Sequence, residues 1–299
     1  MARLLSGSGL PPTLYGTARR DDSGAPDVLA ALRMGYAGVD TAGSTRFHDE
    51  SADGQALSEF LSGLHGKWAA LSSSSRTPRD SVFVQTKYVP PAGQTAPWPY
   101  DIADDTQTRV YKSVLRSAAR LGAFDVIDAY FLNAPLDSFG ETAEAWVALE
   151  RIVDRGGIRY LGIANVGLPA LRQLYDSARI KPQLVQNWFR ASTRFDSDVV
   201  RFCCSAGITY QPFGVFDADN APLLDCEAIG RLSEGRRLTK HQALLRMLLA
   251  GAKMMGLQLC ILDGSRGYVH MEENLAAVRD LDGINELDIR AFLSLISWK

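Results

Sequence analysis

Polar side chains stand where several apolar runs of the sequence stop. They are Asp40, Lys87, Asn133, Asn165, Gln186 and Gln211. A polar residue at the end of a strand often only caps the next loop, but the carboxyl ends of parallel strands meet at one edge, where catalytic groups gather. A carboxylate and a lysine on consecutive strands can form a buried pair, which keeps both charged and lets the lysine acidify a neighbouring group. Asp40 and Lys87 therefore predict a site for proton transfer.

The segments that must position these residues alternate between short β-branched or aromatic runs and longer runs of helical period. The expected strands are Leu14–Thr17, Val39–Ala42, Val82–Lys87, Val126–Asn133, Tyr160–Asn165, Leu184–Phe189, Ile208–Phe213 and Leu257–Leu262. The expected helices are Asp27–Met34, Glu50–Leu61, Thr108–Leu121, Glu141–Arg155, Pro169–Ala178, Ser197–Ser205, Thr239–Met255 and Met271–Leu281. This alternation is typical of βα units around a parallel sheet. Eight such units predict an α/β protein with the (β/α)8 TIM barrel fold.

Two long connections interrupt this rhythm. The connection Ser62–Asp80 follows a helix and contains the serine run 72–75, so we expect a flexible insertion at the face opposite the catalytic groups. The connection Tyr88–Gln107 follows a strand, so it should overhang the mouth of the site.

The composition limits the classes of function. The chain has 299 residues, 46% of them hydrophobic, and a formal net charge of -2. We expect one domain over residues 1–299 and a small-molecule substrate, since this charge provides no field for nucleic acid or an anionic membrane. The first residues form too short an apolar run for a signal peptide, and no later stretch approaches a membrane span. We therefore expect a cytoplasmic protein; its oligomeric state is left open.

The four cysteines, Cys203, Cys204, Cys226 and Cys260, have the spacing of neither a disulfide framework nor a metal site. We expect reduced and mostly buried thiols, and no bound metal.

Five segments carry a resemblance to the aldo-keto reductase family. They are GYAGVDTAGSTRFHDESADG, VFVQTK, VIDAYFLNAPL, LGIANVGLPAL and LVQNWF, which are similar to the family's segments around its aspartate, lysine, histidine and nicotinamide ligands. The resemblance extends over nearly the whole chain and is strongest to fungal members, which share the turn Asp263–Ser265 and the helix start His270–Met271. It implies the barrel fold, a small-molecule carbonyl substrate and NADP(H) as cofactor.

The chain departs from the family at two of four catalytic positions. The family reduces carbonyls with a tyrosine as proton donor, tuned by lysine, aspartate and histidine, and Asp40 and Lys87 match two of these. The tyrosine position falls on Phe47 or, in an alternative placement, on His48, and the histidine position is Asn133. Asn133 can donate a hydrogen bond but cannot relay a proton. His48 is either the replacement acid, with Lys87 nearby favouring its neutral form, or a solvated loop residue.

The residues that the resemblance assigns to the cofactor give a mixed result. Those that match are Gly16, Thr17, Asn165, Gln186, Gln211, Ser265, Glu273 and Asn274. Ala164 replaces a serine, Asp263 stands where a cation is expected near the 2′-phosphate, and His270 replaces an arginine. A carboxylate beside a phosphate is unfavourable. We expect NADP(H) to bind weakly, or to bind without a redox role. His270 and Arg266 are the two candidates for a compensating cation at the cofactor, and Arg266 is the better one.

Three interpretations of function remain. The first is an NADP(H)-dependent reductase whose substrate is a bulky carbonyl or enone of secondary metabolism. Its proton donor would be His48, a loop tyrosine such as Tyr88, or water. The second is a redox-neutral dehydratase, isomerase or cyclase in which Lys87 and His48 move protons and Asn133 polarises an oxygen. The third is a non-catalytic protein that binds a dinucleotide. The preserved nicotinamide-facing residues favour the reductase.

Overall fold

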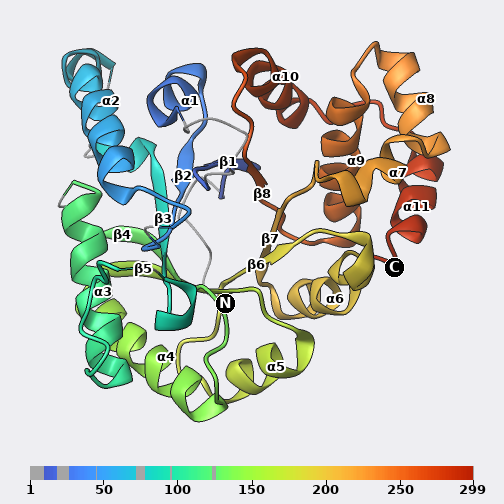
Figure 1. The fold of residues 1–299 in the computed structure, drawn as a ribbon. Coiled ribbons are helices and arrows are strands. Elements are labelled where there is room, and N and C mark those ends of the chain that lie inside the picture. Colours follow the sequence, from blue (N-terminus) through green and yellow to red (C-terminus); the bar gives the residue numbers. More distant parts are fainter. Residues whose placement is uncertain are drawn as a thin grey trace. The chain divides into compact units, whose positions relative to one another are not determined.

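A computed structural model describes residues 10–18, 27–44, 46–71, 78–94, 96–122 and 126–298. The chain forms two compact units, which we treat separately. The N-terminal unit is Leu14–Pro182, and the C-terminal unit is Gln183–Lys299 together with the stretch that ends at Thr13. Figure 1 gives the labels of the elements.

The N-terminal unit contains a run of parallel strands that places the candidate catalytic residues. In order they are β1 (Thr13–Gly16), β2 (Gly38–Asp40), β3 (Phe83–Tyr88), β4 (Ile127–Leu132) and β5 (Ile158–Ala164), each paired with the next. In the register, Asp40 is opposite Gln85 and Lys87 is opposite Phe131. Strands β2, β3 and β4 are buried on both faces, as in parallel sheets covered by helices.

Helices alternate with these strands. They are α1 (Val28–Met34), α2 (Glu50–Leu71), α3 (Thr106–Arg120), α4 (Phe139–Asp154) and α5 (Leu168–Ser177), with short 3-10 helices at η1 (Pro78–Ser81) and η2 (Pro91–Gly93). Each helix from α1 to α4 packs on the next one along the chain. Capping side chains fix several starts: Asp27 and Asp105 accept backbone N–H bonds, and Ser138 forms a capping box with Glu141.

The C-terminal unit continues the alternation and adds helices to it. Its strands are β6 (Leu184–Trp188), β7 (Thr209–Phe213) and β8 (Ile261–Asp263); β6 and β7 pair in parallel. Its helices are α6 (Ser197–Ala206), α7 (Ala221–Leu224), α8 (Glu227–Arg236), α9 (Lys240–Met255), α10 (Tyr268–Arg279) and α11 (Glu286–Leu295), with 3-10 helices η3 (Ala191–Asp196) and η4 (Ala218–Asn220). Helix α9 is the centre of the helical layer, since α7, α8, α10 and α11 all pack on it.

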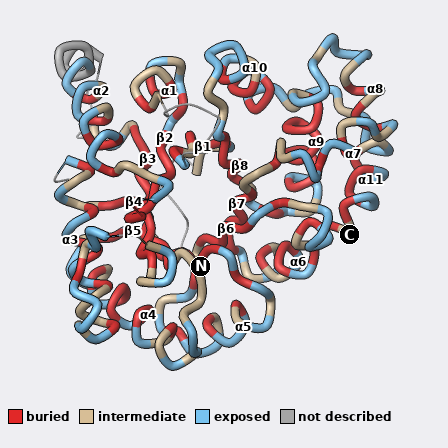
Figure 2. The backbone as a smooth tube through the Cα atoms, in the orientation of Figure 1, coloured by how far each residue is buried: buried red, intermediate tan, exposed pale blue. Residues whose placement is uncertain are grey.

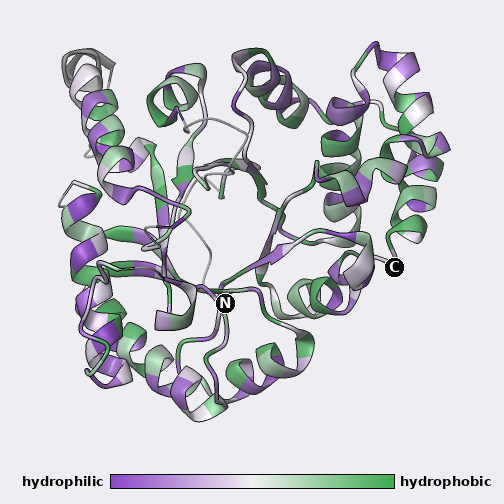
Figure 3. Cartoon of the chain, in the orientation of Figure 1, coloured by the Kyte–Doolittle hydropathy of each residue, from purple (hydrophilic) through white to green (hydrophobic). Residues whose placement is uncertain are grey.

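Burial follows this plan in both units. Most strand residues are buried, and most helices turn one face outward (Figure 2), with the hydropathy of the residues varying accordingly (Figure 3). Helix α9 is an exception, since all its residues from Ala243 to Ala252 are buried. Two glycines allow close backbone contacts near the candidate site. A Cβ at Gly38 would lie 2.3 Å from the carbonyl oxygen of Phe83, and one at Gly54 would lie 2.1 Å from that of Arg120. Gly38 thus lets β2 approach β3, and Gly54 lets α2 rest directly on α3.

All eight expected strands and eight expected helices are present, with ends shifted by a few residues. The expectation for Ser62–Asp80 was wrong in part, because α2 continues to Leu71 instead of ending at Leu61. The serine run 72–75 lies outside the described residues. Helices α7, α8 and α11 were not predicted. Among the described helices, none has the length and apolar character needed to cross a membrane.

Candidate active site

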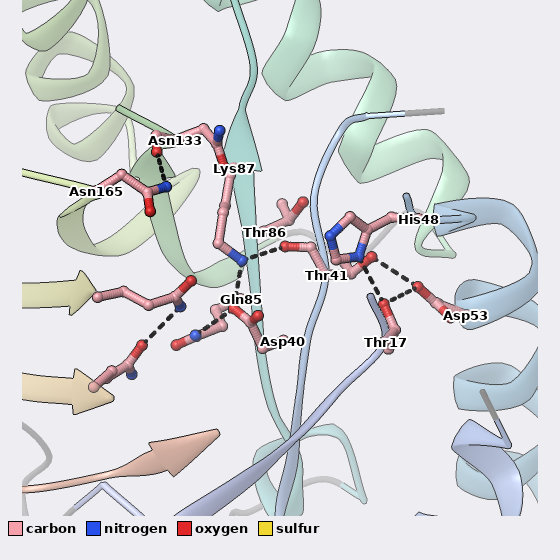
Figure 4. A network of polar contacts seen from close by, with 12 residues as sticks. Thr17, Asp40, Thr41, His48, Asp53, Gln85, Thr86, Lys87, Asn133 and Asn165 are labelled. Carbon is pink, nitrogen blue, oxygen red and sulfur yellow. Dashed lines mark hydrogen bonds and ion pairs between the residues drawn. The ribbon is translucent and has the colours of Figure 1, made fainter. Parts of the chain in front are cut away.

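A buried ion pair joins the ends of β2 and β3. The Lys87 ammonium donates to Asp40 Oδ1 at 2.6 Å and to the Thr41 carbonyl oxygen at 2.8 Å. Gln85 donates a further hydrogen bond to Asp40 Oδ1 at 2.6 Å. The side chains of Lys87 and Asp40 are only 5% and 7% exposed. The predicted pair is therefore present, and three polar contacts fix its geometry (Figure 4).

Contacts with neighbouring groups hold the ammonium group of Lys87 in a fixed position. Two of the three ammonium hydrogens are used by Asp40 and Thr41, and the nitrogen lies 5.9 Å from the ring centre of Phe131. A cation held in this way by a carboxylate and a carbonyl does not need to reorganise when negative charge develops nearby. The site therefore supplies a fixed positive field at the ends of these strands.

His48 belongs to a second network, which is linked to the first by Thr41. Its Nδ1 atom lies 3.0 Å from the Thr17 hydroxyl, which donates to Asp53 Oδ2 at 3.1 Å. The Thr41 hydroxyl donates to the same oxygen at 2.7 Å, while the Thr41 carbonyl accepts from Lys87 (Figure 4). His48 is half-buried and held in a defined position. Of the two alternatives for this residue, the structure therefore favours a positioned side chain over a solvated loop residue.

Asp53 is the carboxylate at the centre of this second network. Burial raises its pKa to about 7, although the hydrogen bonds from Thr41 and Thr17 act in the opposite direction. The charges of Asp49 and Glu50 raise the pKa further. Asp53 thus sits near the midpoint of its titration at neutral pH, where a group can both bind and release a proton.

Glu50 forms a neighbouring polar cluster on the same helix. It accepts a hydrogen bond from the Thr86 hydroxyl at 2.7 Å and lies 3.5 Å from the Arg120 guanidinium. Burial raises its pKa, against the hydrogen bonds from Thr86 and Ser117 and the charge of Arg120. These contacts fasten the start of α2 to β3 and α3, and so fix the helix turn that carries Asp53.

Phe47, one of the two placements of the family's tyrosine, and Tyr88, one of the suggested replacement donors, are both unsuited to donate a proton to a substrate. Phe47 lies in the loop before α2 with its side chain 45% exposed, and the Arg46 guanidinium stacks over its ring at 4.8 Å. Tyr88 is fully buried against Tyr100, at 5.6 Å between ring centres, and burial raises its pKa. The suggestion of Tyr88 as a loop donor was therefore wrong, because it is a core residue whose proton is held more tightly than usual.

Asn133 and Asn165 follow β4 and β5. The Asn133 N–H donates to the Tyr88 carbonyl oxygen at 2.9 Å, and the Asn165 side chain donates to the Asn133 carbonyl oxygen at 2.7 Å. Asn165 adopts a left-handed φ of 50°, which asparagine tolerates better than most residues. Asp40, Lys87 and Asn133 thus lie at the carboxyl ends of three adjacent strands, as predicted (Figure 4). Gly16 is opposite Asp40 in the register of β1 and β2.

In the C-terminal unit, Gln186 and Gln211 face each other on β6 and β7. They are register partners, both are buried, and Gln186 Nε2 donates to Gln211 Oε1 at 3.1 Å. The pair therefore presents the remaining amide atoms of two side chains from one level of the sheet.

The loop after β8 forms a pocket of about 330 Å³. It is lined by Phe216, Thr239, His241, Ser265, His270, Glu273 and Asn274. Four of these were predicted as cofactor residues. His241 is an exposed residue of α9, and its ring packs edge-on against Phe216 at 5.1 Å in this pocket. No motif marks it, because the contact joins α9 to the loop after β7.

Asp263 is turned toward its own loop. Its carboxylate accepts from the Ser265 N–H at 2.9 Å and from the Asn274 side chain at 3.0 Å. Asn274 also donates to Ser265 at 3.1 Å, and His270 lies 3.3 Å from Glu273. An adenosine moiety fits this pocket, because its volume lies in the range of small-ligand sites and its wall combines two aromatic rings with hydroxyl and amide groups. The pocket is less suited to a 2′-phosphate, since the imidazole of His270 already lies beside the carboxylate of Glu273.

Asp53 was not identified from the sequence, although the pattern of the helix that carries it points to this residue. On α2 it shares the buried helix face with Glu50, Leu57 and Leu61, at spacings of three and four residues. A carboxylate on a core-facing stripe is unusual and calls for a partner. Among the described residues, no group of three or more His, Cys, Asp and Glu side chains has an arrangement that could hold a metal ion.

Comparison with known proteins shows the class of this fold. A Bombyx mori aldo-keto reductase crystallised in complex with NADP is 20% identical, with a TM-score of 0.73 over 97% of this chain and 90% of that one. The fold is that of a (β/α)8 barrel, as predicted.

The family follows from the sequence. The model of the aldo/keto reductase family matches residues 11–218, so the chain belongs to this family. It is 24% identical over 219 residues to the uncharacterized oxidoreductase YtbE of Bacillus subtilis, covering 73% of this chain and 67% of YtbE. It is 25% identical over 220 residues to the glyoxal reductase of the same species, with the same coverage of both chains.

Proposed function

We propose that the protein is an NADP(H)-dependent reductase of a carbonyl or enone metabolite in which His48 takes the place of the family's tyrosine as proton donor. The observation that carries the proposal is the buried Lys87–Asp40 pair, joined through Thr41 to the network that holds His48. A fixed cation linked in this way to the network of a positioned imidazole is an arrangement suited to protonating an oxygen while negative charge builds on it. The glyoxal reductase of Bacillus subtilis is among the relatives of this chain, which supports a reductase function.

In this proposal, some residues bind the cofactor and others act on the substrate. When bound, NADP(H) supplies the hydride. Ser265 and Asn274 would hold the adenosine end by hydrogen bonds, and the rings of Phe216 and His241 would supply the apolar wall of its pocket. His48 protonates the substrate oxygen, and Lys87 stabilises the charge that develops there. Asn133 and Asn165 offer amide groups that orient the substrate or the carboxamide of the nicotinamide.

Two further parts of the proposal concern organisation and substrate. We propose that residues 1–299 act as one domain, which predicts a single cooperative unfolding transition.

We also propose a secondary metabolite as substrate, because Phe47 and Trp98 are large exposed aromatics in the loops after β2 and β3. Such side chains suit the recognition of a bulky apolar molecule.

The experiment is a turnover assay with NADPH and a panel of aldehydes, ketones and enones. We expect oxidation of NADPH with at least one member, and a loss of about 100-fold or more in His48→Ala with unchanged nucleotide affinity. His241→Ala is the matched control, since it should weaken nucleotide binding with little effect on the chemical step. Full turnover in His48→Ala would refute the role of His48.

One observation favours a second function, a redox-neutral dehydratase, isomerase or cyclase. His48 and Asp53 form an acid and a base joined by one hydroxyl, which is sufficient for proton shuttling without hydride transfer. Substrate conversion in the absence of nucleotide, with none of the panel reduced in its presence, would establish this function in place of the reductase.

A further inference from the structure

The hydrogen bonds around Thr17 define which protons each atom carries. A hydroxyl has one hydrogen to donate and accepts others. Thr17 Oγ1 lies 3.1 Å from Asp53 Oδ2 and 3.0 Å from His48 Nδ1. If Asp53 is ionised, Thr17 must donate to it and must accept from His48, so Nδ1 carries a hydrogen. If Asp53 is protonated, the direction of both bonds can reverse, and Nδ1 becomes the acceptor.

We propose that Asp53 and Thr17 are positioning residues that hold His48 by its Nδ1 atom and pass a proton to it, so that Nε2 acts on the substrate. The inference rests on the proposed role of His48 in catalysis. The inference gives Thr17 a function that differs from the cofactor contact predicted from the sequence. It also gives a function to the buried acid Asp53, which has no part in the reductase mechanism proposed above.

The proton path balances in each step. As the Nε2–H bond of His48 breaks and the substrate O–H bond forms, Nδ1 takes the hydrogen of Thr17. Thr17 in turn takes the hydrogen of Asp53, which becomes a carboxylate. The imidazole thus begins and ends neutral, and the net proton comes from Asp53. Asp53 is buried, while His48 is half-exposed, so the proton returns from solvent by the same path in reverse.

The geometry around the path supports a relay over a purely structural contact. Thr41 donates to the same oxygen of Asp53, at 2.7 Å, and so holds the carboxyl group with Oδ2 directed at both threonines. The other nitrogen of the His48 ring points away from Thr17 (Figure 4). The charged groups that act on this path are Asp49 just before α2, Glu50 at its first position, and the Asp40–Lys87 pair across Thr41.

The test uses nitrogen NMR of the full-length protein labelled with 15N-histidine. The His48 signals are identified by their loss in His48→Ala. Above the titration of the ring, we expect wild-type His48 to carry its hydrogen on Nδ1, because the Asp53 carboxylate orders Thr17 toward itself. In Asp53→Asn and Thr17→Val this preference should be lost, and Thr17→Ser should restore it.

Thr41→Val is the matched control. It removes a hydrogen bond from the same carboxyl oxygen as Thr17→Val does, but it leaves the path to His48 intact, so the His48 tautomer should stay as in the wild type. In turnover, Thr17→Val should lower kcat by about tenfold with little change in KM, and Thr17→Ser should recover most of the loss.

Identical His48 signals in the wild type, Asp53→Asn and Thr17→Val would overturn the proposal. So would a loss of the Nδ1 hydrogen in Thr41→Val equal to that in Thr17→Val. The NMR result does not depend on any substrate. An ordered His48 in a protein that reduces no carbonyl would therefore contradict the reductase function and leave the assignment of Asp53 and Thr17 standing.

Discussion

Lys87→Met separates the charge of the buried pair from its volume. The substitution keeps an unbranched side chain of similar length but leaves the Asp40 carboxylate, 7% exposed, without its cation. Breaking a buried ion pair by removing one partner costs about 3–5 kcal/mol. We expect the lower end of this range, because Gln85 still donates to Asp40 at 2.6 Å. Turnover should fall by at least about 100-fold, since the fixed positive field is removed.

A second variant makes this prediction specific to the charge. Asp40→Asn combined with Lys87→Met removes both charges, so it should unfold at higher denaturant concentration than Lys87→Met alone while remaining inactive. Cys203→Ser is the control for a buried polar change elsewhere, and it should retain activity because Cys203 belongs to the other unit and takes no part in the contacts of the pair. Urea denaturation and kcat measurements check each variant. Near-normal turnover in Lys87→Met, or recovery of turnover in the double variant, would refute the reasoning.

Three further predictions follow from other parts of the structure. Phe47→Tyr should raise the reduction of simple aldehydes from a low level by adding a phenol; no gain in a variant that still binds nucleotide would show that residue 47 is not the tyrosine position. Arg266→Ala should weaken NADPH binding more than NADH binding, with a small initial preference between them, as measured by fluorescence titration; strong NADPH selectivity that survives the substitution would mean that the phosphate lies elsewhere. Asp53→Asn should flatten the pH dependence of stability. The folded-state pKa of Asp53, about 7, is above its ordinary value, so the folded protein binds the extra proton and its stability falls as pH rises from about 4 to 7. Urea midpoints at the two ends of this range that change equally in the variant and the wild type would contradict this assignment.

The fold was predictable because its repeating unit leaves a strong pattern in the sequence. Each strand is a short buried run, and each helix that follows has an apolar stripe, so the eightfold alternation is visible without any long-range information. Asp40 and Lys87 were predictable for the same reason, since a parallel register brings strand ends together. The helices α8 and α11 were missed because they lie outside this alternation, although Asn285 caps α11 in the usual way.

The second network could not be predicted in the same way. Asp53 meets Thr17 and Thr41, which lie 36 and 12 residues away along the chain on other elements. Only the packing of α2 against the strand ends brings the three side chains together. The contact of His241 is a similar case, since its neighbour Phe216 lies in a loop that is separated from α9 by η4, α7 and α8. Local sequence patterns indicate which face of a helix is buried, but not which polar group it will meet.

The contact at Gly54 has a consequence for how such a site can arise in evolution. Because the backbone of α2 rests directly on that of α3 at this glycine, no side chain at position 54 separates the two helices. An acidic residue at position 53 can then meet the hydroxyls of Thr17 and Thr41 from a turn of the helix that this contact holds in place. Under the proposed function, the gain of this acid adds a proton source to the network of His48 and leaves the Lys87–Asp40 pair as it is.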